Sequence, residues 1–407
     1  MKKIQGGVTA AKGFEAAGVA AEIKYKGRTD MAIVYSQTPC KVAGTFTTNV
    51  AKAAPVKWDQ KIVKESEYAQ VLIVNSGIAN ACTGAEGYGY CQETANKASE
   101  VFGIPAEAVL LGSTGVIGKQ LPIDRICAGV EKLALAKKDT VDAGTAAAKA
   151  IMTTDTCEKE IAVEIDVNGK KVTIGGMAKG SGMIHPNMCT MLSFITTDAV
   201  ISKKALQKAL SEDVNDTYNM ISVDGDTSTN DTVLVLANGM AGNEEIVEGT
   251  KAYDVFVEAL HEINEYLAKK IAGDGEGATA LFEVNVIGAE TKEQAVLLSK
   301  AIACSNLTKT AIAGHDANWG RIICAMGYSG AQFDPEKVDL FFESEVGKIQ
   351  IAEDGVALDF SEEKATEILS QSVVIATADV KMGNEKATAW GCDLTHGYIE
   401  INADYRS

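Results

Sequence analysis

Short runs of apolar residues are frequent in the first half of the chain, and they predict β-strands. The clearest signal is a hairpin: apolar and polar residues alternate in 161–167 and 170–174, and the intervening Asn168-Gly169 favours a two-residue turn. Further strands are expected at 31–36, 42–47, 70–74, 108–112, 191–196, 232–237 and 280–287. Loops at the ends of such strands commonly carry chemistry.

Segments with helical periodicity separate these strands. Helices are expected at 93–102, 123–135, 140–152, 202–211 and 251–271. A second alternation begins at about residue 288, with helices expected at 291–303, 318–327 and 361–370 and strands at 308–313, 338–352, 372–380 and 397–402. We therefore expect a larger domain, residues 1–285, and a smaller C-terminal α/β domain, residues 286–407.

Composition narrows the classes of function. The 407 residues include 38 Lys and Arg against 55 Asp and Glu, and the net charge of −17 disfavours nucleic acid and anionic membranes as partners. No apolar run approaches the roughly 18 residues of a membrane span, and no signal peptide follows the first lysines. The nine cysteines are scattered singly, so neither a disulfide framework nor a metal site is expected. We expect a cytoplasmic protein.

The segment that follows the hairpin is the first candidate for chemistry. Lys179-Gly-Ser-Gly182 leads towards Thr190, which stands between Cys189 and an apolar strand. One interpretation is a glycine-rich loop that enters a core strand, with Thr190 as an ordinary strand-forming residue, because Gly-x-Gly alone is a weak signal. The other interpretation is that Thr190 is a nucleophile.

A nucleophilic Thr190 needs a base for its hydroxyl proton. No triad of the Ser-His-Asp type is recognisable, and His185 precedes a proline in a loop, where a structural role is expected. Cleavage of the Cys189–Thr190 bond would free the α-amine of the threonine, whose pKa of about 8 allows it to accept that proton at neutral pH. The same hydroxyl can first attack the Cys189 carbonyl and cut the chain.

Other polar stretches offer supporting groups. Ser113-Thr114-Gly115 supplies a hydroxyl and a backbone N–H for an oxyanion, although a plain strand-to-helix turn fits the same residues. The stretch 224–231 fails the calcium-loop pattern, because Thr229 and Val235 replace the glycine and the glutamate of that pattern. We expect an Asx-rich turn there that lines a polar pocket.

Three stretches nearer the C-terminus are also polar. Glu276 lies between glycines after a long helix, where it caps that helix or binds an ammonium group. Asp316 is expected to cap the helix that begins near residue 318. The segment 402–407 is expected to form a frayed tail.

Several of these motifs occur in an order that resembles one family. They are Asn75-Ser-Gly-Ile-Ala-Asn80, Gly112-Ser-Thr-Gly-Val-Ile-Gly118, Met152-Thr-Thr-Asp-Thr156, Lys179-Gly-Ser-Gly-Met-Ile-His-Pro-Asn-Met188, Asp224-Gly-Asp-Thr-Ser-Thr-Asn-Asp231, Asp274-Gly-Glu-Gly-Ala-Thr279, Asn318-Trp-Gly-Arg321 and Ile401-Asn-Ala-Asp-Tyr-Arg406. Nearly from end to end, the sequence resembles the ornithine acetyltransferase family of arginine biosynthesis, also called bifunctional glutamate N-acetyltransferase/amino-acid acetyltransferase.

The resemblance implies an α+β fold: a layered α/β/β/α-type sandwich shared with self-processing aminopeptidases. It also implies a smaller C-terminal α/β domain whose last strand and tail return to the active site. Cleavage between Cys189 and Thr190 would give an α chain, residues 1–189, and a β chain, residues 190–407, which assemble as α2β2. Alanine commonly stands where this chain has Cys189, a difference expected to affect only the rate of processing.

The same resemblance implies roles for individual residues. Thr190 would be the nucleophile and, through its freed amine, the base, while Thr114 and Gly115 would form the oxyanion hole. The implied substrate contacts are Thr153, Lys179, Thr190, Glu276, Asn402 and Ser407. Lys179 would bind the α-carboxylate and Glu276 the ammonium group of ornithine.

The implied reaction moves an acetyl group from N-acetylornithine to glutamate through an acetyl-threonine intermediate, giving ornithine and N-acetylglutamate. It needs no cofactor, and acetyl-CoA is left open as a second donor. One alternative is a self-processing amidase or aminopeptidase of the same fold that uses water as acceptor. The other is a non-catalytic amino-acid-binding protein, in which Thr190 is only a strand residue.

Overall fold

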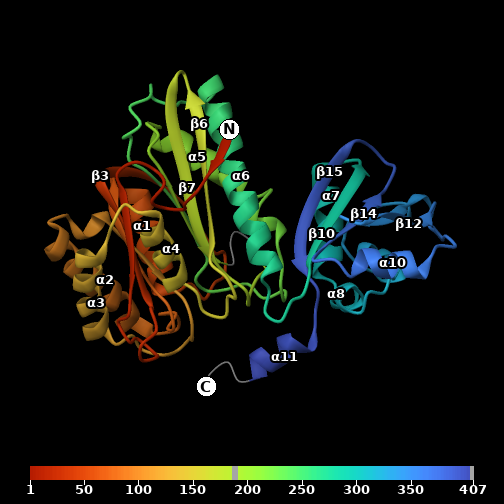
Figure 1. The fold of residues 1–407 in the computed structure, drawn as a ribbon, viewed down its shortest axis with the longest axis horizontal. Coiled ribbons are helices and arrows are strands. Elements are labelled where there is room, and N and C mark those ends of the chain that lie inside the picture. The colour runs from red at the N-terminus through yellow and green to blue at the C-terminus, as the bar shows by residue number, and fades with distance from the viewer. Residues whose placement is uncertain (186–190, 404–407) are drawn as a thin grey trace. The chain divides into compact units, whose positions relative to one another are not determined.

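The computed structural model describes residues 1–185 and 191–403 (Figure 1). Contacts within the chain form two compact units. The described residues of the first unit are 1–180, 191–218 and 227–267, and those of the second are 181–185, 219–226 and 268–403. The second unit includes β10 (Leu281–Ala289), which pairs inside its sheet. It also includes two short segments that no local pattern indicates.

The first unit is built on a mixed sheet. Among the described residues the sheet has nine strands in the order β1-β6-β7-β8-β9-β3-β4-β5, with β2 also paired to β3. Their bounds are β1 Lys2–Ile4, β2 Phe14–Val19, β3 Met31–Phe46, β4 Ala69–Asn75, β5 Val109–Ser113, β6 Lys159–Val167, β7 Lys170–Lys179, β8 Leu192–Thr197 and β9 Thr232–Ala237. Where two strands were expected at 31–36 and 42–47, β3 is continuous: its first part pairs with β2 and β4 and its last part with β9.

The predicted hairpin is confirmed. Strands β6 and β7 pair antiparallel from Lys159 opposite Ala178 to Val167 opposite Lys170. Asn168 and Gly169 both have positive φ, 52° and 80°, as the tight turn between twisted strands requires. Because β7 ends at Lys179, the hairpin helps to set the position of this predicted site residue.

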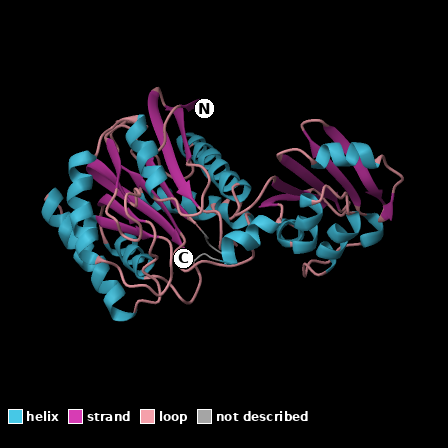
Figure 2. Cartoon of the chain, turned by 60° about the horizontal axis from the view of Figure 1, so that its bottom comes forward, coloured by secondary structure: helices cyan, strands magenta, loops and turns pink. Residues whose placement is uncertain are grey.

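Helices flank the strands of the first unit (Figure 2). They are α1 Ala54–Glu65, α2 Gly84–Phe102, α3 Ile123–Ala136, α4 Val141–Ala150, α5 Lys203–Asp213 and α6 Lys251–Gly273, the last of which continues into the second unit. Helix α1 packs on β5, α4 on β2 and α5 on β3. Apolar side chains from strands and helices, such as Phe14, Leu72 and Val130, form a continuous buried core. The expected α+β architecture is confirmed.

The helix expected at 93–102 is longer than the pattern indicated. Helix α2 already begins at Gly84 and contains three glycines in its first part, which lower helix propensity and hide the helix from sequence analysis. Gly87 is needed there, because a Cβ would lie 1.9 Å from Thr83 Oγ1. Helix α1 and strand β2 were not expected.

The second unit has a six-stranded sheet among its described residues, in the order β13-β12-β11-β14-β10-β15. Its remaining strands are β11 Asp339–Ser344, β12 Gly347–Glu353, β13 Val356–Ala357, β14 Val373–Asp379 and β15 Glu385–Cys392. Its helices are α7 Lys292–Cys304, α8 Asn306–Ala313, α9 Trp319–Gly327, α10 Glu362–Leu369 and α11 His396–Ala403. Helix α7 packs on β10 and β15.

Three predictions for this unit are wrong. The strand expected at 308–313 is helix α8, which Ser305 caps by accepting from the Thr308 N–H. The strand expected at 397–402 belongs to helix α11. Helix α9 is capped by the Asn318 side chain, which accepts from the Arg321 N–H, instead of by Asp316. In α8 the spacing of the buried Thr308, Ala311 and Ile312 is helical, so packing overrides the β-forming threonines.

Candidate active site

The predicted oxyanion residues lie in a loop that leaves β5 and is bonded to the loop after β4. The Thr114 N–H donates to the Asn75 carbonyl at 3.0 Å, and the Val116 N–H donates to the Gly77 carbonyl at 3.1 Å. Gly115 has φ of +128°, and a Cβ there would lie 2.3 Å from the carbonyl carbon of Gly77. Only glycine fits, and because the Thr114 N–H is engaged in the fold, its hydroxyl and the Gly115 N–H are the candidate donors.

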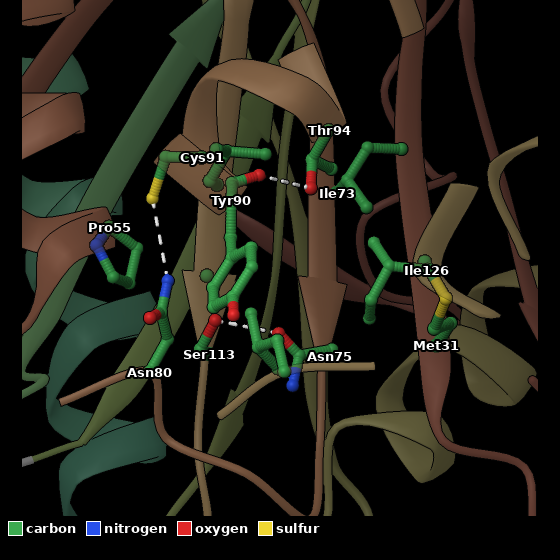
Figure 3. Close-up of a pocket in the computed structure, with 13 residues that line it drawn as sticks. Met31, Pro55, Ile73, Asn75, Asn80, Tyr90, Cys91, Thr94, Ser113 and Ile126 are labelled. Carbon is green, nitrogen blue, oxygen red and sulfur yellow. Dashed lines mark hydrogen bonds between the residues drawn. The ribbon is translucent and has the colours of Figure 1, made fainter. Parts of the chain in front are cut away.

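Buried polar side chains at the ends of β4 and β5, next to this loop in the chain, bond to each other (Figure 3). The Ser113 hydroxyl donates to Asn75 Oδ1 at 2.6 Å, and Asn75 Nδ2 donates to the Ile78 carbonyl at 2.8 Å. Both side chains line a cavity of about 20 Å³, large enough for one water molecule. These amide and hydroxyl groups therefore hold the ends of β4 and β5 in a fixed relation to each other.

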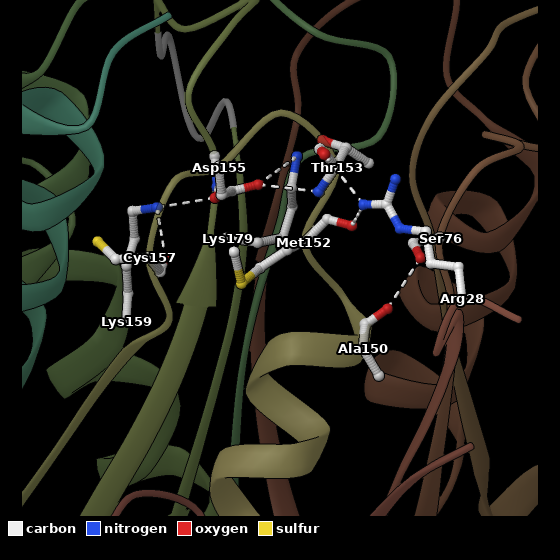
Figure 4. A network of polar contacts seen from close by, with 10 residues as sticks. Arg28, Ser76, Ala150, Met152, Thr153, Asp155, Cys157, Lys159 and Lys179 are labelled. Carbon is white, nitrogen blue, oxygen red and sulfur yellow. Dashed lines mark hydrogen bonds and ion pairs between the residues drawn. The ribbon is translucent and has the colours of Figure 1, made fainter. Parts of the chain in front are cut away.

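A buried ion-pair cluster surrounds the second predicted group, Lys179 (Figure 4). The side chains of Asp155 and Lys159 are fully buried, with Lys159 Nζ 2.8 Å from Asp155 Oδ1, and Lys179 Nζ lies 3.9 Å from Asp155 Oδ2. Burial alone would raise the pKa of Asp155, but Lys179 and Lys159 hold that pKa well below its usual range. Asp155 is therefore a carboxylate at every physiological pH.

Asp155 also orders the backbone on both sides of this cluster. Its carboxylate accepts from the Thr153 N–H at 3.0 Å and from the Gly180 N–H at 2.6 Å. Arg28 holds the same segment by donating to the Thr153 carbonyl at 3.0 Å. Two residues expected to contact substrate, Thr153 and Lys179, are thus positioned by one acid.

The role of Asp155 is not apparent from the sequence. Asp155 lies inside the quoted motif Met152-Thr-Thr-Asp-Thr156, but no role was assigned to it or to Lys159. The only local indication of an ion pair is that Asp155 lies four residues before Lys159, the first residue of β6. Nothing in that spacing reveals that both side chains are fully buried.

The second unit brings together two other predicted residues, Glu276 and Asn402. Asn402 Nδ2 donates to Glu276 Oε2 at 2.7 Å, and the Glu276 N–H donates to the Ser181 carbonyl at 2.9 Å. Glu276 is buried, and a Cβ on Gly182 would lie 2.4 Å from its carboxyl carbon. The Gly-Ser-Gly stretch therefore makes room for this carboxylate.

Asp224, the first residue of the predicted polar turn, lies in the same unit and is fully engaged. It accepts from the Met183 N–H at 2.6 Å, from the Ile184 N–H at 2.8 Å and from the Tyr398 hydroxyl at 3.2 Å. Burial raises the pKa of Tyr398, and the neighbouring Asp224 carboxylate raises it further. Tyr398 is therefore a neutral donor.

The remaining predicted site residues, Cys189, Thr190 and Ser407, lie outside the described residues. His185 is described: its Nδ1 lies 3.1 Å from the Ser222 hydroxyl, and burial lowers the pKa of its imidazole. In the described parts of the chain, no three His, Cys, Asp or Glu side chains are grouped so that they could hold a metal ion, and none of the helices is both long and apolar enough to cross a membrane.

The hydroxyl and N–H of the Thr114–Gly115 loop and the Lys179 ammonium beside a buried carboxylate are groups of the kind that an acyl-transfer site uses. The chain belongs to the ArgJ family, whose model matches residues 15–407. The resemblance seen in the motifs is thereby confirmed.

Relatives match over the whole length. The arginine biosynthesis bifunctional protein ArgJ of Thermotoga neapolitana is 53% identical over 397 residues, which are 97% of this chain and 99% of that protein. The protein of the same name from Caldanaerobacter subterraneus is 50% identical over the full length of both. A crystal structure of the argJ bifunctional protein from Bacillus halodurans has 48% identity and a TM-score of 0.51, covering 53% of this chain and 99% of that one.

Proposed function

We propose that this chain transfers the acetyl group of N-acetylornithine to glutamate in arginine biosynthesis, through an acetyl intermediate on Thr190. The observation that carries the proposal is the match along nearly the whole chain, at about half identical residues, to proteins named arginine biosynthesis bifunctional protein ArgJ. The oxyanion loop and the Lys179 cluster supply groups that such a reaction needs.

The first step is maturation. The Thr190 hydroxyl attacks the Cys189 carbonyl, the peptide nitrogen of Thr190 takes a proton, and water then hydrolyses the ester to give two chains. The β chain, residues 190–407, would hold 218 residues. The solved relative, which is covered to 99% while covering 53% of this chain, has about the length expected for one such product.

In turnover, the free α-amine of Thr190 accepts the hydroxyl proton as Oγ attacks the acetamide carbonyl. The Thr114 hydroxyl and the Gly115 N–H donate to the oxyanion, and ornithine leaves with the proton on its amine. The α-amine of glutamate then attacks the acetyl-threonine, and N-acetylglutamate departs. The first half-reaction leaves Oγ acetylated and the Thr190 amine neutral. In the second, that amine accepts the proton of the glutamate amine and passes it to Oγ as the Thr190 C–O bond breaks. Because ornithine leaves before glutamate attacks, the kinetics are ping-pong.

The other groups would recognise the amino acids. The Lys179 ammonium suits the carboxylate that both substrates share, with Thr153 beside it as a polar contact. The Glu276 carboxylate suits the side-chain ammonium of ornithine, and Asn402 orients that carboxylate. Ser407 would complete the substrate contacts.

The proposal extends to the domains and to the assembly of the cleaved chains. Residues 1–285 would form the catalytic sandwich, residues 286–407 a smaller domain with its tail at the active site, and two copies of each cleaved chain an α2β2 assembly. The enzyme would act in the cytoplasm, without a cofactor, and acetyl-CoA is a candidate second donor.

Two measurements test the proposal. On a denaturing gel, the purified protein should run as two chains, and Thr190→Ala should run as one and be inactive. Incubation with N-acetylornithine should release ornithine only when glutamate is present. Glutamate-independent release would instead indicate an amidase that uses water, and an uncleaved, inactive wild type would indicate a binding protein.

A further inference from the structure

The polar turn after residue 224 contains a side chain whose role no motif indicates. Asn230 is 7% exposed, and its Nδ2 donates to two backbone carbonyls, that of Ala79 at 2.6 Å and that of Ser113 at 2.8 Å. Its Oδ1 accepts from the Thr229 hydroxyl at 2.6 Å. The two carbonyls orient the amide, because they can only accept and therefore must face its NH2 group, which leaves Oδ1 towards the hydroxyl.

The two carbonyls belong to the two segments that define the oxyanion loop. Ser113 directly precedes Thr114, and Ala79 lies in the loop after β4, where its N–H donates to the Val116 carbonyl at 3.0 Å. One amide group therefore bridges both segments at the point where they meet. A displacement of either segment would move the Thr114 hydroxyl and the Gly115 N–H.

The backbone that follows Asn230 is hydrogen-bonded to the residue that precedes strand β8. The Thr232 N–H donates to the Met191 carbonyl at 2.9 Å, and the parallel pairing of β8 with β9 starts at Leu192 opposite Thr232. Met191 is the residue that follows Thr190 in the sequence. A single residue, Asp231, thus separates Asn230, which bonds to the oxyanion loop, from Thr232, which bonds to the residue after the predicted nucleophile.

We infer that Asn230 is a positioning residue that fixes the distance between the oxyanion donors and the start of β8. The inference rests on the proposed function, since it assumes that Thr190 attacks and that Thr114 and Gly115 stabilise the oxyanion. Oxyanion donors act only when they lie within hydrogen-bond distance of the developing charge, and a shift of about 1 Å costs on the order of 100-fold in rate. Removing the clamp should therefore lower kcat and leave substrate binding nearly unchanged.

The chain offers a matched control at the opposite end of the same strand pair. Asn243 is 6% exposed, and its Nδ2 also donates to two backbone carbonyls, that of Val200 at 3.1 Å and that of Glu244 at 2.7 Å. It follows β9, whereas Asn230 precedes it, so the length of a six-residue strand separates the two. Both changes to alanine remove the same group from equally buried positions.

The experiment compares wild type, Asn230→Ala and Asn243→Ala. For each protein, the cleaved fraction is measured by intact mass, the thermal midpoint by calorimetry, and kcat and KM by acetyl transfer from N-acetylornithine to glutamate, per cleaved chain. We expect both variants to lose similar thermal stability. Only Asn230→Ala should lose about 10- to 100-fold in kcat, with KM for N-acetylornithine within about threefold of wild type.

Equal effects of the two variants on kcat, or an unchanged kcat in Asn230→Ala, would overturn the inference and leave the proposed function intact. An inactive wild type would overturn both. If Asn230→Ala does not fold, Asn230→Ser, which keeps one hydroxyl donor, is assayed in the same way. If that variant also fails to fold, Asn230 is a stability residue and the inference is wrong.

Discussion

The two clusters of predicted site residues, one in each unit, hold their carboxylates in different ways. In the first unit, Asp155 is fully buried and faces the ammonium groups of Lys159 and Lys179. In the second unit, Glu276 accepts from the neutral amide of Asn402, and Asp224 accepts from backbone N–H groups and from the neutral Tyr398.

This difference suggests different roles for the two carboxylates: one positions neighbouring residues, and the other recognises the substrate. A carboxylate that is already paired with two lysines is compensated, so its role is to hold Thr153, Lys179 and the neighbouring backbone in place. A carboxylate that accepts hydrogen bonds from neutral groups can still pair with a cationic ligand. This difference is consistent with the proposed roles, in which Asp155 holds the framework of the site and Glu276 binds the ammonium group of ornithine.

The largest effect is expected from Asp155→Asn. The change leaves Lys159, which is fully buried, without its counter-charge, so the free energy of unfolding should fall by about 3–5 kcal/mol. Urea denaturation measures it. Glu158→Gln, which removes an ion pair between the more exposed Lys149 and Glu158, should change stability by less than about 1 kcal/mol. Equal losses in the two variants would show that Asp155 has no special structural role.

Gly115→Ala should have the second-largest effect, on catalysis. The added Cβ collides with Gly77 and displaces the oxyanion donors, so kcat should fall on the order of 100-fold or more. Gly118→Ala is the matched control: Gly118 also has positive φ, 80°, but nothing lies within 4 Å of its Cβ position. Backbone strain should lower the thermal midpoint of this control variant, while its kcat should stay near that of wild type. A large loss of kcat in both would mean that strain alone is responsible.

Glu276→Gln should have a smaller and selective effect. Glutamine keeps the shape and an acceptor for Asn402 but loses the charge, so KM for N-acetylornithine should rise by about 10-fold. KM for glutamate, which has no side-chain ammonium, should change less. Steady-state kinetics with each substrate varied in turn separates the two. Glu283, whose carboxylate accepts from Trp390 Nε1 in the same unit, provides the control. Glu283→Gln should leave both KM values unchanged.

The smallest effect is expected in the pH dependence of stability. The pKa of Asp155 is lowered by folding, so its contribution is present above the unfolded value, about 3.9, and is lost as the pH falls towards the folded value. The stability difference between wild type and Asp155→Asn should therefore be constant from about pH 7 to 5 and decrease below about pH 4. Urea titrations at four pH values measure it, and a difference that decreases above pH 5 would contradict the lowered pKa.

Local signals along the chain were sufficient for much of the fold. The Asn168-Gly169 turn, the alternation around it and the apolar strands were predicted from adjacent residues alone, because turn geometry and side-chain period act over short distances. The motifs were sufficient for the family, and they include Thr114, Gly115, Lys179 and Glu276.

Tertiary structure decided the features that depend on distant partners. Residues 308–313 carry β-forming threonines yet form a helix, because Ser305 caps it and one helical face is buried. Asp155 acquired its role only when β7 brought Lys179 beside it, and Asn230 only when the β4 and β5 loops presented their carbonyls. Hydrogen bonds and ion pairs form between groups that are close in space, and burial strengthens them. When those groups are far apart in the sequence, the sequence reveals neither which groups pair nor how strong the interaction is.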